Sequence, residues 1–460
     1  MELEGKRVLV VGLARSGVAA IKLLVSHGAK VTANDTKPDL SKEAAEIGST
    51  GVKIVGGGHP EELFLSADLI VLSPGVPTDL PAIRAARRTG VKIVSEVELA
   101  AWFLKGRLIG VTGSNGKTTT TTLIGELLKA LGEEVVIGGN IGNPLTGLIE
   151  KTTDRSWTVA ELSSFQLESI DRLRVNVAVV TNVTPDHLDR HASLDDYVNA
   201  KRRIFENQTE SDWAVLNGCD DTVVKMGSGT RSGRIYFSLA GHETAAGAAA
   251  VYRRHEWIRS TMPASGGVET DVIPLSEIPL PGLHNVENVM AALGAVFCVR
   301  NEGADDLPAL REAIKSFKGV EHRIEFVAEI NGAKYYNDSK ATNVDSTKKA
   351  LESFEHNVIL VLGGKDKGSD YTVLAALIRE RVKLIVLLGA ASDKIASQLG
   401  GTAEMVRARS MEEVVRLALE AAKSGDTVLF APACASFDMF DNYEHRGRVF
   451  KEEVRKRVSD

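Results

Sequence analysis

The stretch LIGVTGSNGKTTT, residues 108–120, joins an apolar run, a glycine-rich loop and the start of a helical pattern. A loop between a strand and a helix directs backbone N–H groups at phosphate oxygens, and the helix dipole favours the same negative charge. Lys117 can reach the β- and γ-phosphates of a nucleotide, and the Thr118 hydroxyl can bind magnesium. The alternative is a capped glycine-rich turn without a ligand. The lysine, the hydroxyls and the strand–helix order together favour a phosphate site in an α/β fold.

One position of this stretch departs from the usual P-loop pattern. That pattern has a Gly five positions before Gly116, where this chain has Val111. The local form is instead TGSNGKT, which narrows the choice of family.

Length and composition limit the class of protein. A chain of 460 residues is too long for one core, and 43% hydrophobic with 25% charged residues is ordinary for a globular protein. The net charge of -6 argues against a nucleic-acid partner. Cys219, Cys298 and Cys434 are too few and too far apart for a disulfide framework or a zinc pattern, which fits a reducing cytoplasm. Because the first residues are acidic and the apolar runs are short, we expect neither a signal peptide nor a membrane span.

Apolar runs typical of buried strands alternate with helical patterns along the chain, which predicts doubly wound, mostly parallel sheets. We expect three α/β blocks, at residues 1–95, 96–319 and 320–460. Residues 228–274 are rich in Gly, Ala and Ser and are interpreted as β-hairpins or an insertion, and a helix at 286–299 closes the second block. The mixed basic and acidic run at 451–457 is typical of a solvated helix.

Polar loops follow the expected strands of the first block. The loop GLARSG at residues 12–17 resembles the dinucleotide fingerprint but has Ala14 at its second glycine, so it favours some nucleotide over NAD itself. Asp35 ends the next strand, where such folds place a ribose-binding acid, and Ser73 and Gly75 end a later one. A tight turn that needs small residues is the alternative.

The second block has two further candidates. Glu161 ends a strand near the phosphate loop and suits a magnesium ligand, although an acid at a helix N-terminus is the alternative. His187 follows another strand, between Asp186 and Asp189, and could bind a metal or polarise a substrate. Lys201 lies on an expected helix at 194–205, and its spacing alone predicts only a solvated lysine.

The third block contributes three polar or small-residue loops, at residues 337–343, 363–367 and 431–437. Each follows an expected strand, so all three would lie at one edge of a sheet. Such a grouping is typical of a substrate pocket.

Together these motifs resemble the Mur ligase family, with the branch that adds D-glutamate as the most similar. The motifs are GLARSG at 12–17, SPG at 73–75, residues 112–119, GNIG at 139–142, ELSSFQL at 161–167, DSKATN at 338–343 and PACAS at 432–436. The resemblance covers essentially the whole chain. It implies a three-domain, monomeric cytoplasmic enzyme of peptidoglycan precursor synthesis, with a part in cell shape and cell division. Its N-terminal domain would bind a UDP-sugar, its central domain ATP and Mg²⁺, and its C-terminal domain the amino acid.

The resemblance also implies residue roles, which are expectations here. The catalytic and metal-binding set is Lys117, Thr118, Glu161, His187 and Lys201, with Lys201 carbamylated. The ATP set is Gly113, Ser114, Asn115, Gly116, Lys117, Thr118, Thr119, Asn288, Arg323, Asp338 and Lys340. The set for UDP-N-acetylmuramoyl-L-alanine is Arg15, Ser16, Asp35, Thr36, Lys37, Ser73, Gly75, Asn140 and His187. The D-glutamate set is Thr342, Lys367, Ser436, Phe437 and Tyr443, of which Tyr443 stands where Phe is frequent.

Other functions stay open from the residues alone. A different Mur ligase or a folylpolyglutamate-type synthase would use another amino acid or acceptor. A non-catalytic nucleotide-sugar sensor would bind without ATP turnover, and a dehydrogenase would bind NAD(H).

Overall fold

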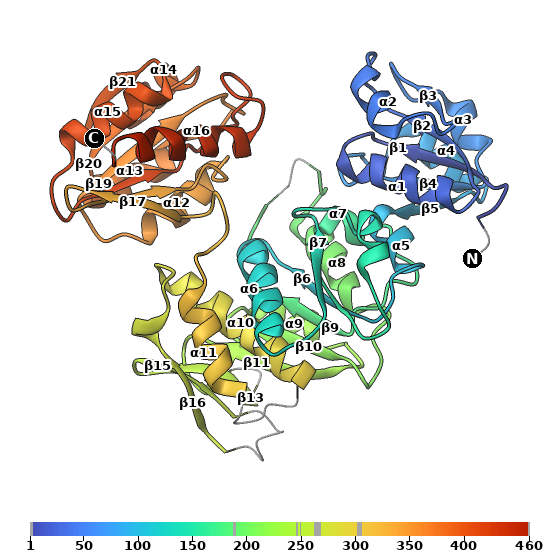
Figure 1. The fold of residues 1–460 in the computed structure, drawn as a ribbon, viewed down its shortest axis with the longest axis horizontal. Helices are drawn as coiled ribbons and strands as arrows, with labels where there is room; N and C mark the ends of the chain where they lie inside the picture. Colours follow the sequence, from blue (N-terminus) through green and yellow to red (C-terminus); the bar gives the residue numbers. More distant parts are fainter. Residues whose placement is uncertain are drawn as a thin grey trace. The chain divides into compact units, whose positions relative to one another are not determined.

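The computed structural model describes residues 3–186, 190–244, 247–248, 250–261, 268–300 and 306–458. The chain forms two compact units, residues 1–278 with 286–315 and residues 279–285 with 316–460. The expected α/β class is confirmed, because three large, mostly parallel sheets follow one another along the sequence. Figure 1 shows them in blue, in cyan to yellow, and in orange to red. The boundaries of the three domains proposed from the sequence stay predictions.

The first sheet is entirely parallel, in the order β3-β2-β1-β4-β5. Its strands are β1 (Arg7–Val11), β2 (Lys30–Asn34), β3 (Lys53–Val55), β4 (Leu69–Leu72) and β5 (Lys92–Ser95), and its helices are α1 (Arg15–Ser26), α2 (Ser41–Ile47), α3 (Glu61–Leu65) and α4 (Pro81–Arg88). Alternate residues of β1 enter two different core clusters, one on each face, which explains why the strand is apolar from Val8 to Val11. Strand order reverses at β1, so the loops after β1 and β4 are neighbours at the switch point.

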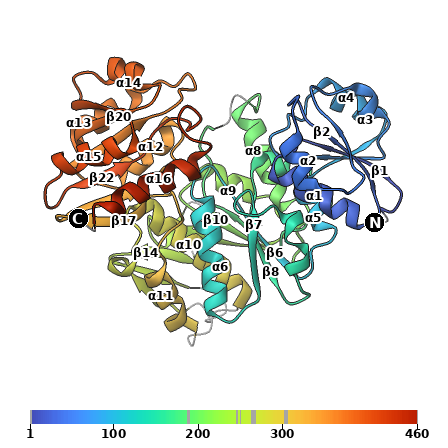
Figure 2. The same cartoon turned by 45° about the horizontal axis from the view of Figure 1, so that its top comes forward.

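The second sheet has nine strands, in the order β16-β15-β14-β11-β10-β9-β6-β8-β7. They are β6 (Arg107–Thr112), β7 (Val135–Gly139), β8 (Trp157–Glu161), β9 (Val177–Val180), β10 (Trp213–Asn217), β11 (Gly233–Ser238), β14 (Val251–Arg254), β15 (Trp257–Ser260) and β16 (Thr270–Pro274), with β12 (Glu243–Thr244) and β13 (Gly247–Ala248) as a separate pair. The helices are α5 (Glu96–Ala101), α6 (Lys117–Ala130), α7 (Ser164–Leu167), α8 (Leu194–Arg202), α9 (Asp221–Gly227), α10 (Leu283–Arg300) and α11 (Leu307–Ser316). Helix α6, which begins at the phosphate loop, packs along β6, β7 and β8 (Figure 2).

Residues 228–274 contain the predicted hairpins, because β14, β15 and β16 pair antiparallel. They also contain β11, a strand that pairs parallel with β10 and that the sequence analysis did not identify. The Gly and Ser content of this stretch hid the β11 pattern.

The third sheet has the order β17-β18-β22-β19-β20-β21, parallel except for the edge strand β17. The strands are β17 (Glu325–Ile330), β18 (Ala333–Asn337), β19 (Val358–Gly363), β20 (Val382–Leu388), β21 (Glu404–Ala408) and β22 (Thr427–Phe430). The helices are α12 (Val344–Glu352), α13 (Ala375–Arg381), α14 (Ser392–Leu399), α15 (Met411–Ala421) and α16 (Tyr443–Lys456).

The prediction that residues 451–457 form a solvated helix is wrong for the first residue of this range. Lys451 of α16 is buried, and its Nζ lies 2.6 Å from Glu321 Oε1 and 2.8 Å from Glu325 Oε1. These two acids are far from Lys451 in sequence, so the local pattern of charges could not reveal the pairing.

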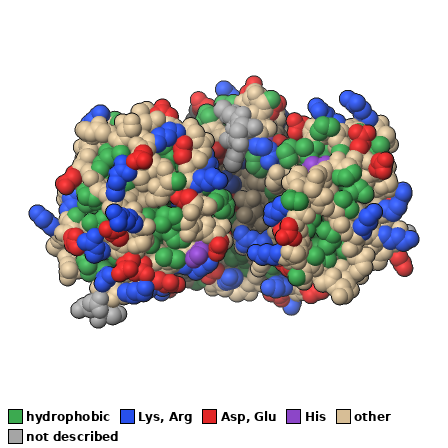
Figure 3. All heavy atoms as spheres, turned by 90° about the horizontal axis from the view of Figure 1, so that it is seen from above, with side chains coloured by type: hydrophobic (Ala, Val, Ile, Leu, Met, Phe, Trp, Pro, Cys, Tyr) green, Lys and Arg blue, Asp and Glu red, His purple; other side chains and the backbone are tan. Residues whose placement is uncertain are grey.

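None of the helices in the described ranges combines the length and the hydrophobicity that a membrane-spanning helix requires. The face drawn in Figure 3 has Lys and Arg side chains interspersed with Asp and Glu. The three cysteines are free thiols.

Candidate active site

The phosphate loop connects the end of β6 to the first residue of α6 and depends on two glycines. Gly113 has φ +143° and Gly116 has φ +81°, which are conformations that other residues rarely adopt. A Cβ at Gly113 would lie 2.0 Å from Thr181 Oγ1, and one at Gly116 would lie 2.2 Å from Asn288 Oδ1. The backbone conformation and the packing therefore both require glycine.

The segment after β9 holds this loop in shape. The Asn115 N–H donates to Asn182 Oδ1 at 2.9 Å, and Thr181 Oγ1 donates to the Asn115 carbonyl at 2.6 Å. Ser114 Oγ accepts from the Thr184 N–H at 2.9 Å. Thr181, Asn182 and Thr184 thus support the loop through hydrogen bonds to its backbone and to Ser114.

Two lysines converge on one carbonyl of the loop. Lys117 Nζ lies 3.0 Å and Lys201 Nζ 2.8 Å from the Gly113 oxygen, although α8 supplies Lys201 from much later in the chain. Lys201 is only 1% exposed, so the solvated lysine expected from its spacing is wrong. Burial, and then the Lys117 charge, lower the pKa of Lys201 well below its ordinary value.

Glu161 is the last residue of β8 and is buried. Thr118 Oγ1 donates to Glu161 Oε2 at 2.7 Å, and Asn140 Nδ2 donates to Glu161 Oε1 at 2.9 Å. The structure thus brings together Thr118 of α6, Asn140 directly after β7, and Glu161 at the end of β8. His187 lies outside the described residues.

These oxygens fit a hard cation. One carboxylate and one hydroxyl beside a phosphate loop form the small protein ligand set that Mg²⁺ takes when water and phosphate supply the rest. Within the described ranges, no cluster of three His, Cys, Asp or Glu side chains suggests a site built from protein ligands alone.

The N-terminal candidates gather at the switch point of the first sheet. Ser73 Oγ donates to the Gly12 carbonyl at 2.7 Å, which joins the loops after β4 and β1. The Asp35 carboxylate accepts from the backbone N–H of Leu13 at 2.7 Å and of Lys37 at 3.0 Å. Partial burial is the largest single influence and acts to raise the pKa of Asp35. The two N–H groups, the Lys37 charge and the Thr36 hydroxyl together outweigh it and lower the pKa.

The other residues of this set lie around the same loops. Arg15 and Thr36 are exposed and Ser16 is half-buried. Lys37 Nζ is 3.1 Å from Glu43 Oε1, in an exposed ion pair that contributes little stability.

Arg190 was missed by the sequence analysis and contacts this region. Its guanidinium donates to the Gly75 carbonyl at 3.2 Å and lies 4.4 Å from the centre of the Phe165 ring. An arginine in a polar loop gives no sequence signal of such a contact.

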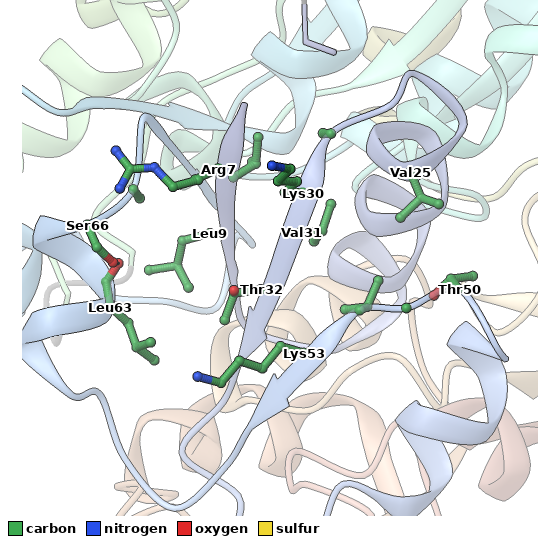
Figure 4. Close-up of a pocket in the computed structure, with 15 residues that line it drawn as sticks. Arg7, Leu9, Val25, Lys30, Val31, Thr32, Thr50, Lys53, Leu63 and Ser66 are labelled. Atoms are coloured by element: carbon green, nitrogen blue, oxygen red, sulfur yellow. The ribbon is translucent and has the colours of Figure 1, made fainter. Parts of the chain in front are cut away.

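The cavity in Figure 4, of about 420 Å³, is a different place from these loops. It is lined by Arg7, Lys30 and Lys53, which are the first residues of β1, β2 and β3. Because ligands of such sheets bind beyond the carboxyl ends of strands, this cavity is not the predicted UDP-sugar site.

Asp338 follows β18 in the other compact unit and is 7% exposed. Burial raises the pKa of Asp338 to about 7, against the opposing charge of Arg323 and a hydrogen bond from the Ile324 backbone. Two candidates for the nucleotide, Asp338 and Arg323, are thus close enough to interact. Asn288 belongs to the unit with the phosphate loop, so the predicted ATP residues are divided between the units.

The amino-acid candidates occupy loops at one edge of the third sheet. Lys340 Nζ lies 5.7 Å from the centre of the Tyr443 ring, and Ser339 Oγ donates to the Tyr443 carbonyl at 2.9 Å. Thr342 is half-buried in the same loop. These contacts join the loop after β18 to the start of α16.

The loops after β19 and β22 are also joined. Lys365 and Ala435 exchange two backbone hydrogen bonds, of 2.8 and 3.1 Å. Lys367 is exposed on the first loop, while Ser436 is buried and Phe437 is 68% exposed on the second. The predicted grouping of the three loops is therefore present.

A buried arginine that the sequence analysis missed connects these loops. Arg446 of α16 is 1% exposed and donates to Ser339 Oγ, the Ser339 carbonyl and the Cys434 carbonyl at 2.8 to 3.1 Å. Burial lowers the pKa of Arg446 to about 10. Its position in a charged, amphipathic helix resembles that of a surface residue, which hid it.

Known proteins match nearly the whole length of the chain. Residues 6–95 match the family "Mur ligase MurD-like, N-terminal domain", 111–296 the "Mur ligase middle domain", and 322–434 the "Mur ligase, glutamate ligase domain". A UDP-N-acetylmuramoylalanine--D-glutamate ligase of Koribacter versatilis is 47% identical over 99% of this chain and 98% of its own. One of Geotalea daltonii is 46% identical over the same shares.

Solved structures with low sequence identity have the same fold. A UDP-N-acetylmuramate-alanine ligase of Thermotoga maritima has a TM-score of 0.61 at 20% identity and covers 99% of this chain and 100% of its own. A pseudomurein peptide ligase of Methanothermus fervidus has a TM-score of 0.59 at 21% identity, with 98% and 100% covered.

Proposed function

Because the chain belongs to the Mur ligase family, we propose that it is an ATP-dependent ligase that joins D-glutamate to UDP-N-acetylmuramoyl-L-alanine. The observation that carries this proposal is 47% identity to a D-glutamate ligase over 99% of the chain. The reaction would belong to peptidoglycan precursor synthesis in the cytoplasm, with a monomeric enzyme and small-molecule partners only.

The chemistry needs an activated carboxylate. An oxygen of the acceptor carboxylate attacks the γ-phosphorus of ATP, the bond to the bridging oxygen breaks, and ADP leaves. The amine of D-glutamate then attacks the acyl carbon, a proton leaves the nitrogen, and phosphate departs as the amide forms. Both steps bring anions together, so the enzyme must supply positive charge and alignment.

The phosphate loop supplies part of that charge. The N-terminus of α6 directs N–H groups at phosphate oxygens, and residues 113–119 form the loop and the first turn of this helix. Lys117 Nζ lies within 3.0 Å of the Gly113 and Ser114 carbonyls, at the base of the loop. From this position the Lys117 ammonium would stay close to the γ-phosphoryl group during its transfer, so we propose Lys117 as a catalytic residue.

Thr118 and Glu161 would hold Mg²⁺, together with His187. When bound, Mg²⁺ neutralises phosphate charge during transfer. Asn140 fixes one Glu161 oxygen through its 2.9 Å hydrogen bond and so sets the direction of the other. Asn140 and His187 would also contact the muramoyl-alanine end of the acceptor.

Lys201 would act as a carbamate, formed when its neutral amine adds CO₂ and releases a proton. The lowered pKa of Lys201 supports this, because burial and Lys117 favour the neutral amine that the addition requires. A carbamate would give the site another hard oxygen ligand, whereas an ammonium would repel the metal.

The remaining roles follow the family motifs. Asn288, Arg323, Asp338 and Lys340 would hold ATP. The acceptor would bind Arg15, Ser16, Asp35, Thr36, Lys37, Ser73 and Gly75. D-glutamate would bind Thr342, Lys367, Ser436, Phe437 and Tyr443, with the exposed Lys367 as cation for its side-chain carboxylate.

A phosphate-release assay tests this proposal. Purified enzyme receives ATP, Mg²⁺, the UDP-muramoyl-alanine acceptor and one amino acid at a time. We expect turnover with D-glutamate and background rates with L-glutamate, L-alanine and meso-diaminopimelate. Preference for another amino acid, or for a folate acceptor, would contradict the assignment, and UDP-sugar binding without ATP turnover would indicate a sensor.

A further inference from the structure

A buried tyrosine links the two loops that carry most of the proposed D-glutamate residues. Tyr371 is 0% exposed, and its hydroxyl lies 2.9 Å from Asp366 Oδ1 and 3.0 Å from Cys434 Sγ. Asp366 directly precedes Lys367 in the loop after β19. Cys434 is two residues before Ser436 in the loop after β22.

Asp366 is fixed on its other side as well. Lys394 of α14 donates to Asp366 Oδ2 at 2.8 Å, and its Nζ lies 5.6 Å from the centre of the Tyr371 ring. Lys394, and to a smaller degree Tyr371, hold the pKa of Asp366 at about 2. The carboxylate therefore stays ionised and has its two oxygens directed at Tyr371 and Lys394.

The thiol in this cluster is not a candidate nucleophile. Cys434 is 1% exposed, and burial raises the pKa of its thiol. Reactive thiols need a lowered pKa and access to the reagent, and Cys434 has neither. The cluster thus has the character of a support, in which the hydroxyl of Tyr371 is the shared hydrogen-bonding group.

Within the residues that the structure describes, backbone hydrogen bonds do not connect the outer part of the loop after β19, at Asp366 and Lys367, to the loop after β22. The Lys365–Ala435 hydrogen bonds join the loops at their bases, before Asp366 and Lys367. Beyond that pair, the Asp366 carboxylate also accepts from the Ser369 N–H at 3.2 Å, which closes the turn around Lys367. The orientation of this turn relative to the β22 loop then depends on the bonds of the Tyr371 hydroxyl.

We propose, on the basis of the function proposed above, that Tyr371 is a positioning residue for D-glutamate, which holds the Lys367 turn in register with the loop of Ser436. It would not touch the substrate. Its loss would let Lys367 move away from the distal carboxylate while the phosphate loop, in the other compact unit, stays unchanged.

The variant Tyr371→Phe tests this, because it keeps the buried ring and removes only the hydroxyl. We expect the KM for D-glutamate to rise on the order of tenfold, since a buried hydrogen bond to a charged group is lost. The KM values for ATP and for the acceptor should stay within about twofold of wild type, because only the amino-acid site is affected.

Tyr335→Phe is the matched control. Tyr335 is also 0% exposed, lies in the same compact unit, and its hydroxyl has no hydrogen-bond partner in the described part of the chain. This variant removes an equivalent buried atom without breaking a hydrogen bond, so its KM for D-glutamate should equal that of wild type.

Two variants of Asp366 test its hydrogen bond with the Tyr371 hydroxyl. Asp366→Asn keeps an oxygen that can accept from Tyr371, whereas Asp366→Ala does not, so the alanine variant should have the higher KM for D-glutamate. An unchanged KM in Tyr371→Phe, or equal effects on all three substrates, would overturn the role of Tyr371. Failure of wild-type enzyme to use D-glutamate, or of Lys367→Ala to raise its KM, would instead refute the proposed function or its site.

Discussion

Replacing Asp338 by Asn should make the free energy of unfolding less dependent on pH. The carboxyl group of Asp338 is buried, which raises its pKa from an ordinary 3.8 to about 7. The folded protein therefore binds this proton more tightly than the unfolded chain does. Stability from this group is fully present below pH 3.8 and is lost as the pH rises through 7. Asn stays neutral at every pH and lacks this loss.

The size of the effect follows from the same values. Each pKa unit corresponds to about 1.36 kcal/mol, so the total loss is about 4 kcal/mol. Linkage places about 2.5 kcal/mol of that loss between pH 5 and pH 8. Wild type should lose this amount relative to Asp338→Asn over that interval, while contributions of all other groups cancel in the comparison.

Urea unfolding of both full-length proteins at pH 5 and pH 8 measures this difference. Asp345→Asn, which alters a carboxylate whose side chain is 62% exposed, serves as the control. The free-energy difference between wild type and Asp338→Asn should change by about 2.5 kcal/mol between the two pH values. An equal difference at both would refute the buried, proton-binding carboxyl.

Three further variants test the phosphate loop and its surroundings. Lys117→Ala should abolish ligation and leave UDP-sugar binding intact in a calorimetric titration; near-normal turnover would exclude Lys117 from the phosphates. Gly116→Ala should cost about 1–2 kcal/mol from its left-handed backbone alone and should displace Asn288, 2.2 Å from the new Cβ, so a thermal melt equal to wild type would contradict the loop geometry. Lys201→Ala should be nearly inactive and partly rescued by formate. Full activity of this variant, together with an unmodified mass of the wild-type protein in native mass spectrometry, would contradict the carbamate proposal.

The parts of the fold that could be predicted from the sequence are those in which one local structural requirement explains the pattern of residue types. Runs such as 8–11 and 358–362 are apolar throughout because both faces of their strands are covered, and they lie in β1 and β19. The strand–loop–helix at 108–120 was predictable for the same reason, since its glycines and its lysine are required by local geometry.

Features that depend on distant partners could not be predicted from the sequence. Lys201 and Lys451 have the spacing of surface lysines, and only the fold places one on the Gly113 carbonyl and the other between two glutamates. Tyr371 lies in a stretch with no recognisable motif, although its hydroxyl joins two loops. The roles of these three residues depend on contacts with residues that are distant in sequence, and the spacing of residues along the chain does not predict such contacts.

Transfer of an oxygen isotope tests the central claim most directly. The acceptor is labelled with ¹⁸O in its terminal carboxylate and incubated with the enzyme, ATP, Mg²⁺ and D-glutamate, and the released phosphate is analysed by mass spectrometry. If the carboxylate becomes an acyl phosphate, each phosphate released with ligated product carries one ¹⁸O from the acceptor. Unlabelled phosphate released together with ligated product would contradict the account.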